Sequence, residues 1–242
     1  MIKSPYPEEE QAFRLIRERL ERIEDALGEA CVRCGRRRED ITVMAVTKTV
    51  APVYINYAVE QGGLTLLGEN KAQELCEKYD SYTLKRDNIH FIGHLQTNKV
   101  RQVIDKVSMI QSVDSVHLAQ EIEKQAAKAD RMLDVLIEVN VGSEESKSGI
   151  APERLDELLE GIAGLPHICV RGLMAIPSKE KTEENFSRMQ ELFEGLKMSS
   201  HDRLSMEVLS LGMSGDYPLA VQYGSTMVRL GSAIFGPRTI VK

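Results

Sequence analysis

The sequence predicts an α/β protein, a (β/α)₈ barrel of the TIM type with an additional helix at its N-terminus. Eight short apolar runs of strand length, helical periodicity between them and a regular spacing of the runs predict this fold class. The runs begin at residues 41, 64, 89, 109, 133, 168, 206 and 227. Parallel strands joined by right-handed crossovers require such a repeated strand-to-helix step. In 242 residues a closed barrel is favoured over an open doubly wound sheet of eight strands, the second choice.

The first segment, about residues 8–34, is predicted to form a long amphipathic helix ahead of the barrel. Apolar side chains recur there at helical spacing, with Arg and Glu between them. They are Phe13, Ile16, Leu20, Ile23, Leu27 and Ala30. The barrel is expected over about residues 41–236. Because no linker or low-complexity segment interrupts the chain, we expect one domain over residues 1–242.

Strands and helices are expected to alternate after this first helix. The predicted strands are 41–46, 64–67, 89–92, 109–113, 133–141, 168–174, 206–210 and 227–230. Two of the helices between them have clear signals. Residues 115–129 place Leu118, Ile122 and Ala126 on one stripe, and residues 152–163 have a proline near their start.

Composition and charge exclude several classes of protein. With 42% hydrophobic and 28% charged residues, the chain is an ordinary globular protein. Its net charge of −6 repels polyanions, so we expect no nucleic-acid partner. Neither a long apolar run nor a signal-peptide core is present, so we expect a cytoplasmic protein without membrane contact. Cys31 and Cys34 have CxxC spacing but no second such pair accompanies them, so we expect no metal site.

Glycines and small hydroxyls gather after the seventh and eighth predicted strands. In such barrels these two loops commonly bind a phosphate group through backbone N–H groups. Glycine lets the backbone approach an anion closely, and serine adds a hydroxyl donor. Tight turns with helix N-caps favour the same residues and are the alternative interpretation. The candidates are Gly212, Ser214, Gly215, Gly231 and Ser232.

A lysine and an arginine stand at unusual places in the apolar pattern. Lys48 follows the first predicted strand, where a desolvated amine can form a Schiff base with a carbonyl. Alternatively, its stem simply extends into water. Arg229 lies inside the eighth predicted strand. It either faces the barrel interior among acceptors or points outward to a helix carboxylate, and since both faces of a barrel strand are buried, the strand period does not choose.

A Schiff-base lysine, a phosphate cradle and an arginine near a ring nitrogen are together what pyridoxal 5′-phosphate (PLP) requires of its host. Over essentially its whole length the chain resembles the pyridoxal-phosphate homeostasis family. The matching motifs are AVTK at 45–48, GEN at 68–70, HFIG at 90–93 with LQ at 95–96 and NK at 98–99, GLMA at 172–175, LGMS at 211–214 with Asp216, and RLGSAIFG at 229–236.

This resemblance implies a barrel like that of alanine racemase (PLP fold type III) with PLP bound as a covalent aldimine to Lys48. It also implies that Arg229 faces the pyridine nitrogen and that Asn70 and Met174 line the ring pocket. The phosphate ligands would then be Ser214, Gly231 and Ser232.

The expected function is PLP binding, buffering and delivery, with no catalytic residues. A permanently cationic Arg229 at the ring nitrogen disfavours protonation there and weakens carbanion stabilisation. We also expect no second domain that would supply a base opposite the lysine; Tyr217 and Tyr223 are the minor candidates for that role. A PLP-dependent amino-acid racemase or lyase is the alternative. Apo PLP-dependent enzymes are the partners that delivery requires, and a monomer or weak homodimer is expected. Lys147 is a candidate second amine for PLP hand-off.

Overall fold

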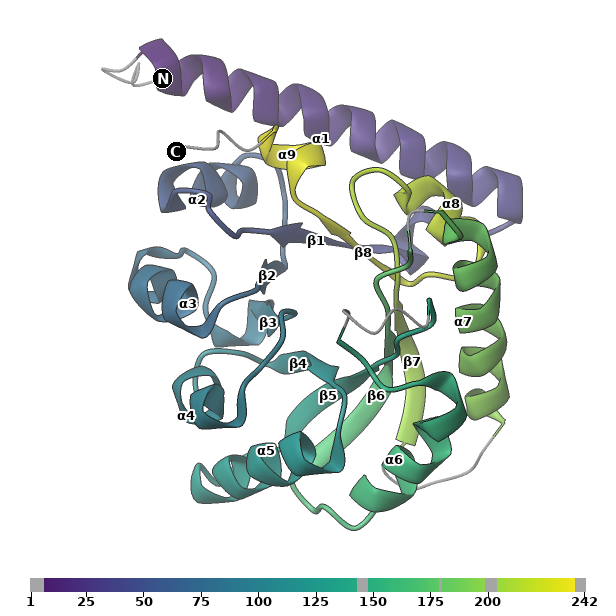
Figure 1. Ribbon diagram of the computed structural model, residues 1–242. Helices are drawn as coiled ribbons and strands as arrows, with labels where there is room; N and C mark the ends of the chain where they lie inside the picture. The colour runs from purple at the N-terminus through teal and green to yellow at the C-terminus, as the bar shows by residue number, and fades with distance from the viewer. Residues whose placement is uncertain (1–6, 143–147, 179, 199–203, 238–242) are drawn as a thin grey trace.

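The structure, a computed structural model, describes residues 7–142, 148–178, 180–198 and 204–237. In this part of the chain eight parallel strands close into a barrel in sequential order, with helices around them (Figure 1). β1 and β8 close the barrel, with Ala45 beside Leu230. The predicted barrel is therefore confirmed, and the open doubly wound sheet is wrong. The strands are β1 Thr42–Val46, β2 Leu67–Glu69, β3 Ile89–Phe91, β4 Met109–Val113, β5 Leu133–Glu138, β6 Ile168–Met174, β7 Leu204–Ser210 and β8 Met227–Leu230.

The helices begin and end where local sequence signals place them. α5 begins after Ser115, whose hydroxyl accepts the Leu118 N–H at 3.3 Å and so caps the helix. α2 and α8 each have a proline in their first turn, where its missing N–H costs nothing. The helices are α1 Pro7–Cys34, α2 Pro52–Glu60, α3 Ala72–Lys78, α4 Val100–Val103, α5 Val116–Lys128, α6 Leu155–Ile162, α7 Thr182–Lys197, α8 Tyr217–Gln222 and α9 Ser232–Phe235.

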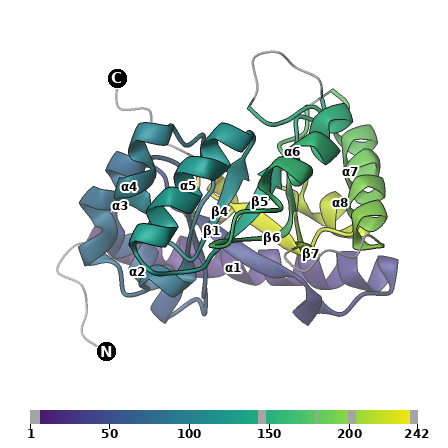
Figure 2. The same ribbon diagram turned by 90° about the horizontal axis from the view of Figure 1, so that it is seen from below.

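The predicted N-terminal helix is confirmed as α1, which runs across the outside of the barrel (Figure 2). It packs on α2, α8 and α9. Its apolar stripe is buried, and Leu27 is 0% exposed; burying one such side chain contributes about 1.5–3 kcal/mol. Beyond its end, Arg36 donates hydrogen bonds to the carbonyls of Val221 (3.0 Å) and Ser225 (2.7 Å). The helix is thereby attached to the segment that leads into β8.

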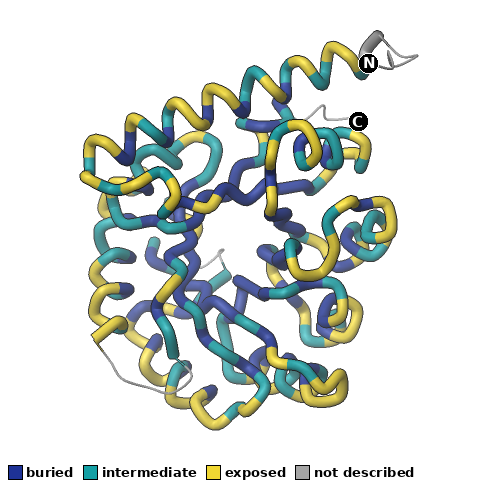
Figure 3. Tube along the Cα trace, turned by 180° about the vertical axis from the view of Figure 1, so that it is seen from behind, coloured by how far each residue is buried: buried dark blue, intermediate teal, exposed yellow. Residues whose placement is uncertain are grey.

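Two separate apolar regions account for the packing of the barrel. One lies between the strands and the surrounding helices and is the larger. The other fills the barrel interior with alternate side chains of the strands, as this architecture requires. Figure 3 shows the buried strands at the centre and the exposed outer faces of the helices. The interior apolar residues form two groups, one of Met44, Val46, Leu66, Ile92 and Met227, and one of Met109, Leu136 and Met174.

The second strand lies later in the chain than the sequence predicts. A strand is expected over 64–67, whereas β2 is Leu67–Glu69. Its last residue, Glu69, is charged and marks the predicted loop, yet it is fully buried and pairs with Phe91 of β3. Because Glu69 is charged, the sequence prediction places it in a loop and so misplaces the strand.

The other strand boundaries differ by a few residues. The fifth strand ends at Glu138 rather than 141, because Val139 pairs only with Ile150 in an isolated bridge. β7 begins at Leu204, two residues before the predicted start. Among the described helices, none is both long and apolar enough to cross a membrane.

Candidate functional site

The seven sequence-predicted site residues lie at the carboxyl ends of their strands. Four of them follow directly on strand ends or belong to them, two lie in the loops after β1 and β7, and Ser232 is the first residue of α9. Because the strands of the barrel are parallel, these ends meet at one face, where ligands of such barrels bind. The residues, in chain order, are Lys48, Asn70, Met174, Ser214, Arg229, Gly231 and Ser232.

Lys48 is half-buried and lies in a tight turn just beyond β1. The Val50 N–H donates to the Thr47 carbonyl at 3.0 Å and closes the turn. Thr49, at the third position of the turn, has φ +63°, a left-handed conformation that a β-branched residue rarely adopts. The Thr47 N–H donates to the Gly68 carbonyl at 3.1 Å and so extends the hydrogen-bond ladder between β1 and β2 to the turn. The lysine therefore projects from a defined backbone.

Glu69 supports the same turn from β2, a contact that sequence reasoning missed. Its Oε1 accepts hydrogen bonds from the Thr47 hydroxyl (2.6 Å) and from the Tyr82 hydroxyl. Its Oε2 is buried and has no hydrogen-bond partner among the described residues. Burial raises the pKa of this carboxyl group above its usual range. An acidic residue ending an apolar run was the only signal in the sequence.

The loops after β7 and β8 are joined through Ser214. Its hydroxyl oxygen accepts the N–H of Gly231 (3.3 Å) and of Ala233 (3.0 Å). A hydroxyl also has one proton to donate, so Ser214 retains a donor for a ligand. Within the described residues the N–H groups of Ser214, Gly215 and Ser232 make no hydrogen bond. These donors favour an anion cradle.

The N-cap interpretation explains these serines less well. Ser232 is the first residue of α9 rather than its cap, and the cap position, Gly231, has no side chain to bond. The Ser214 hydroxyl serves α9 from another loop, 19 residues away from Ala233. α8 begins after Asp216, which forms no side-chain cap bond.

Arg229 faces the barrel interior and is 3% exposed, which decides between the two orientations that the sequence left open. Its guanidinium donates to the Ser210 carbonyl (2.6 Å), the Ser210 hydroxyl (2.7 Å) and the Ala175 carbonyl (2.8 Å). Burial lowers its pKa to about 10, while the charges of Glu138 and Asp216 act in the opposite direction. Arg229 therefore remains a cation at neutral pH.

A hydrogen-bonded chain continues from Arg229 across the interior, and sequence reasoning missed it. The Ser210 hydroxyl donates to Gln111 Oε1 at 2.8 Å, and Gln111 Nε2 lies 2.9 Å from His90 Nδ1. With these directions, His90 Nδ1 is the acceptor. Burial lowers the pKa of His90 to about 4, so the imidazole is neutral at physiological pH.

Glu138 adds an acidic group at the end of β5. Its side chain is buried. Burial raises its pKa to about 7, and the negative charge of Asp114 contributes further, whereas Arg229 lowers it. The candidate site thus contains a carboxyl group that titrates near neutrality, which no sequence signal indicated.

Asn70 and Met174 differ in what they offer a ligand. The Asn70 Oδ1 atom is buried without a hydrogen-bond partner among the described residues, as is Ser112 Oγ of β4. Such atoms are rare in native proteins and fit a ligand that supplies the missing partner. Gly93 lets the Asn70 backbone approach closely, since a Cβ there would lie 2.1 Å from the Asn70 carbonyl oxygen. Met174, by contrast, is fully buried within the interior apolar group.

The remaining candidates of the sequence are two tyrosines, a lysine and two cysteines. The Tyr223 hydroxyl donates to Glu183 at 2.6 Å, and Tyr217 is half-buried with a pKa raised by burial. Lys147 lies outside the described residues. Cys31 is buried in α1, and Cys34 Sγ lies 3.2 Å from the Ala30 carbonyl oxygen, so both thiols belong to the packing of that helix.

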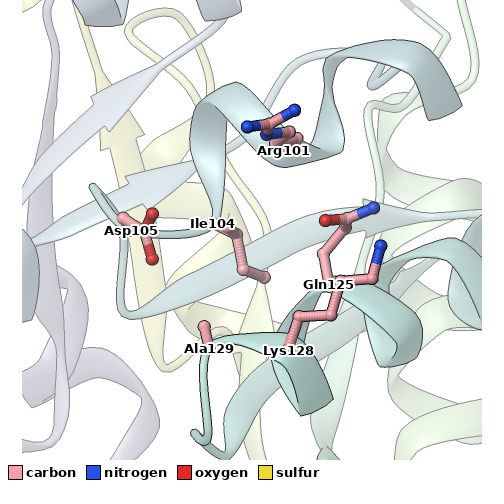
Figure 4. A pocket seen from close by; sticks show the side chains of 6 residues that line it. All are labelled: Arg101, Ile104, Asp105, Gln125, Lys128 and Ala129. Carbon is pink, nitrogen blue, oxygen red and sulfur yellow. The ribbon is translucent and has the colours of Figure 1, made fainter.

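A surface pocket lies between α4 and α5 (Figure 4). It lies where the two helices end and the chain enters β4 and β5, which is the amino-terminal face of the barrel. The pocket is therefore not the candidate site. It is lined by Arg101, Ile104, Asp105, Gln125, Lys128 and Ala129.

The barrel and its loops define the class of protein. The family model described as "Alanine racemase, N-terminal domain" matches residues 24–239. A pyridoxal phosphate homeostasis protein of Aquifex aeolicus is 41% identical over 225 residues, covering 91% of this chain and 97% of its own. The protein of the same name from Haemophilus influenzae is 40% identical over 229 residues, covering 92% and 96%. The chain therefore belongs to the alanine racemase N-terminal domain family. Within that family it belongs to the pyridoxal phosphate homeostasis proteins.

Solved structures agree with this assignment. An unknown protein from Bifidobacterium adolescentis superposes with a TM-score of 0.85 at 32% identity, covering 93% of this chain and 96% of that one. PipY of Synechococcus elongatus, solved with PLP bound, superposes with a TM-score of 0.72 at 28% identity, covering 87% and 100%. Alanine racemase from Corynebacterium glutamicum, at 14% identity and a TM-score of 0.67, covering 95% and 62%, shares the fold.

Proposed function

We propose that this protein binds PLP at the carboxyl face of its barrel and serves to store, buffer and deliver it. One observation carries the proposal: a primary amine and an anion cradle project from neighbouring strands. Ala45 pairs with Leu230, so the Lys48 turn and the Gly231–Ser232 segment follow adjacent strand ends. PLP, when bound, supplies an aldehyde that condenses with an amine and a phosphate that accepts hydrogen bonds.

The residues of the chain divide the work of binding. Lys48 Nζ is the proposed point of covalent Schiff-base attachment. The Ser214 hydroxyl and the N–H groups of Gly215 and Ser232 are the proposed phosphate donors. Asn70 Oδ1, which lacks a partner among the described residues, is available to accept a hydrogen bond from the ring substituents. Arg229 is held by Ser210 and Ala175 and presents a fixed positive charge to the ring.

Two features of the site support a carrier role: the positive charge of Arg229 and the bonded hydroxyl of Tyr223. A permanent cation at the ring nitrogen disfavours a second positive charge there and so weakens the electron sink that racemisation uses. The Tyr223 hydroxyl is already bonded to Glu183, which leaves it a poor second base. PLP held this way is available for transfer to apo PLP-dependent enzymes.

The test combines spectroscopy with transfer. Wild type mixed with PLP is expected to show the absorption band of a Schiff base, and Lys48→Ala is not; Lys71→Ala, an exposed lysine at the same face, is the matched control. The loaded protein is then expected to activate an apo PLP-dependent enzyme. Incubation with amino acids in D₂O is expected to give no exchange of the α-proton. Exchange would establish the racemase or lyase alternative instead.

A further inference from the structure

An ion pair on α3 holds the turn that bears Lys48. Glu74 Oε1 accepts the Thr49 N–H at 2.5 Å and Lys78 Nζ at 2.5 Å. Lys78 Nζ also donates to the Thr47 carbonyl at 3.0 Å. The backbone groups on either side of Lys48 are therefore bonded to the two members of one pair.

This pair differs from the other i,i+4 pairs on the helix surfaces. Its side chains are only 15% and 16% exposed, whereas those of Arg33 and Glu29 on α1 are 65% and 70% exposed. Exposed pairs contribute little because water and salt screen them. The Glu74–Lys78 pair is shielded from water and bonds to the backbone of the Lys48 turn. The geometry of the pair therefore affects the geometry of that turn.

The turn needs support of this kind. Thr49 has φ +63°, a left-handed conformation that is strained for a β-branched residue and persists only where its surroundings hold it. Thr49 directly follows Lys48, so relaxation of its φ to a negative value would reorient the lysine. The Thr47 hydroxyl is held separately by Glu69, which fixes the turn at its start but not at Thr49.

We propose that Glu74 and Lys78 are positioning residues that hold the strained turn and so direct the Lys48 amine toward the cofactor. The inference rests on the proposed function, since Lys48 must be the attachment point for its direction to matter. It assigns the pair no contact with the cofactor. The pair affects PLP binding by fixing the direction of the Lys48 amine before PLP binds.

The first test compares Glu74→Ala with a control on the same helix. Removal of one charge-assisted hydrogen bond is expected to weaken PLP binding about tenfold or more in a spectroscopic titration. Borohydride should still attach the cofactor to Lys48. Glu77→Ala is the control, because Glu77 is exposed and bonded to Gln73 of the same helix; it is expected to bind like wild type.

A rescue distinguishes positioning from general stability. Glycine adopts positive φ without strain, so Thr49→Gly added to Glu74→Ala is expected to recover most of the lost affinity. A second readout uses the free protein: amide exchange of the segment containing Thr49 should be faster in Glu74→Ala. Lys78→Met, which removes the donor to Thr47, should weaken binding in the same direction and serves if Glu74→Ala does not fold.

Wild-type affinity in Glu74→Ala or Lys78→Met overturns the inference, as does a loss that Thr49→Gly does not reduce. Lys48→Ala, measured alongside, separates the two claims. If Lys48→Ala binds PLP like wild type, the proposed attachment itself fails. If Lys48→Ala loses binding while Glu74→Ala keeps it, only the positioning role fails.

Discussion

The guanidinium of Arg229 donates to the hydroxyl of Ser210 at 2.7 Å inside the barrel. Ser210 passes a hydrogen bond on to Gln111, which lies 99 residues away in the sequence. Each member of the chain from Arg229 to His90 thus fixes the next. A cation buried in an apolar barrel is tolerated because its donors meet acceptors.

Ser210→Ala should destabilise the protein by about 1–3 kcal/mol, because it leaves Gln111 Oε1 buried without a donor. Urea unfolding measures the change. Ser205→Ala, on the same strand but half-exposed and bonded to Arg171, is the control and should change stability by less than about 0.5 kcal/mol. Equal losses of stability in the two variants would show that the interior hydrogen bonds of Ser210 contribute no more to stability than the Ser205–Arg171 contact.

Glu138→Gln should alter the pH dependence of stability. The folded pKa is raised to about 7 from 4.5, so the folded state binds more protons between these values and wild type loses stability as pH rises through that window. The loss is about 3 kcal/mol. The amide of the variant does not titrate, so the variant should gain on wild type by that amount between pH values of about 4 and about 8. Parallel curves for the two proteins would contradict the raised pKa.

His90→Asn should act in the opposite direction. The folded pKa is lowered to about 4 from 6.5, so the unfolded state binds more protons in this window and wild type loses stability as pH falls through it, by about 3 kcal/mol. Asparagine keeps an acceptor for Gln111 but does not titrate. Denaturation at several pH values should therefore give a flatter acid limb for the variant. An acid limb as steep as that of wild type would mean that His90 is protonated in the fold.

Ser214→Ala should weaken binding of PLP but not of pyridoxal, which lacks the phosphate. The substitution removes both the bridge between the two loops and the outward hydroxyl donor. We expect about tenfold weaker PLP binding, the equivalent of one hydrogen bond to a charged group. Ser187→Ala on α7, whose hydroxyl is bonded to Glu191, is the control. Equal losses for PLP and pyridoxal would place the phosphate elsewhere.

The barrel could be predicted because its signal is repeated along the chain. Eight apolar runs with helices between them specify the fold even when one strand, β2, is misplaced by a few residues. Lys48 and the loops that contain Ser214 and Gly231 could be located because they interrupt that pattern at strand ends. Residues that interrupt a regular apolar pattern at predicted strand ends can be recognised from the sequence alone.

The interior contacts could not be predicted, for a physical reason. Both faces of a barrel strand are buried, so alternation does not show which side chains point inward. Gln111 and Ser210 meet across the barrel, and nothing in either strand indicates the other. Glu74 and Lys78 have the spacing of an ordinary surface pair, and their contacts with the Lys48 turn depend on how α3 packs against that turn.

The most direct test of the account is the site of cofactor attachment. PLP-loaded protein is reduced with borohydride, digested and analysed by mass spectrometry. The account predicts one pyridoxyl group on the peptide containing Lys48, present in wild type and in Lys71→Ala and absent from Lys48→Ala. Attachment at another lysine, or equal labelling of wild type and Lys48→Ala, would contradict it.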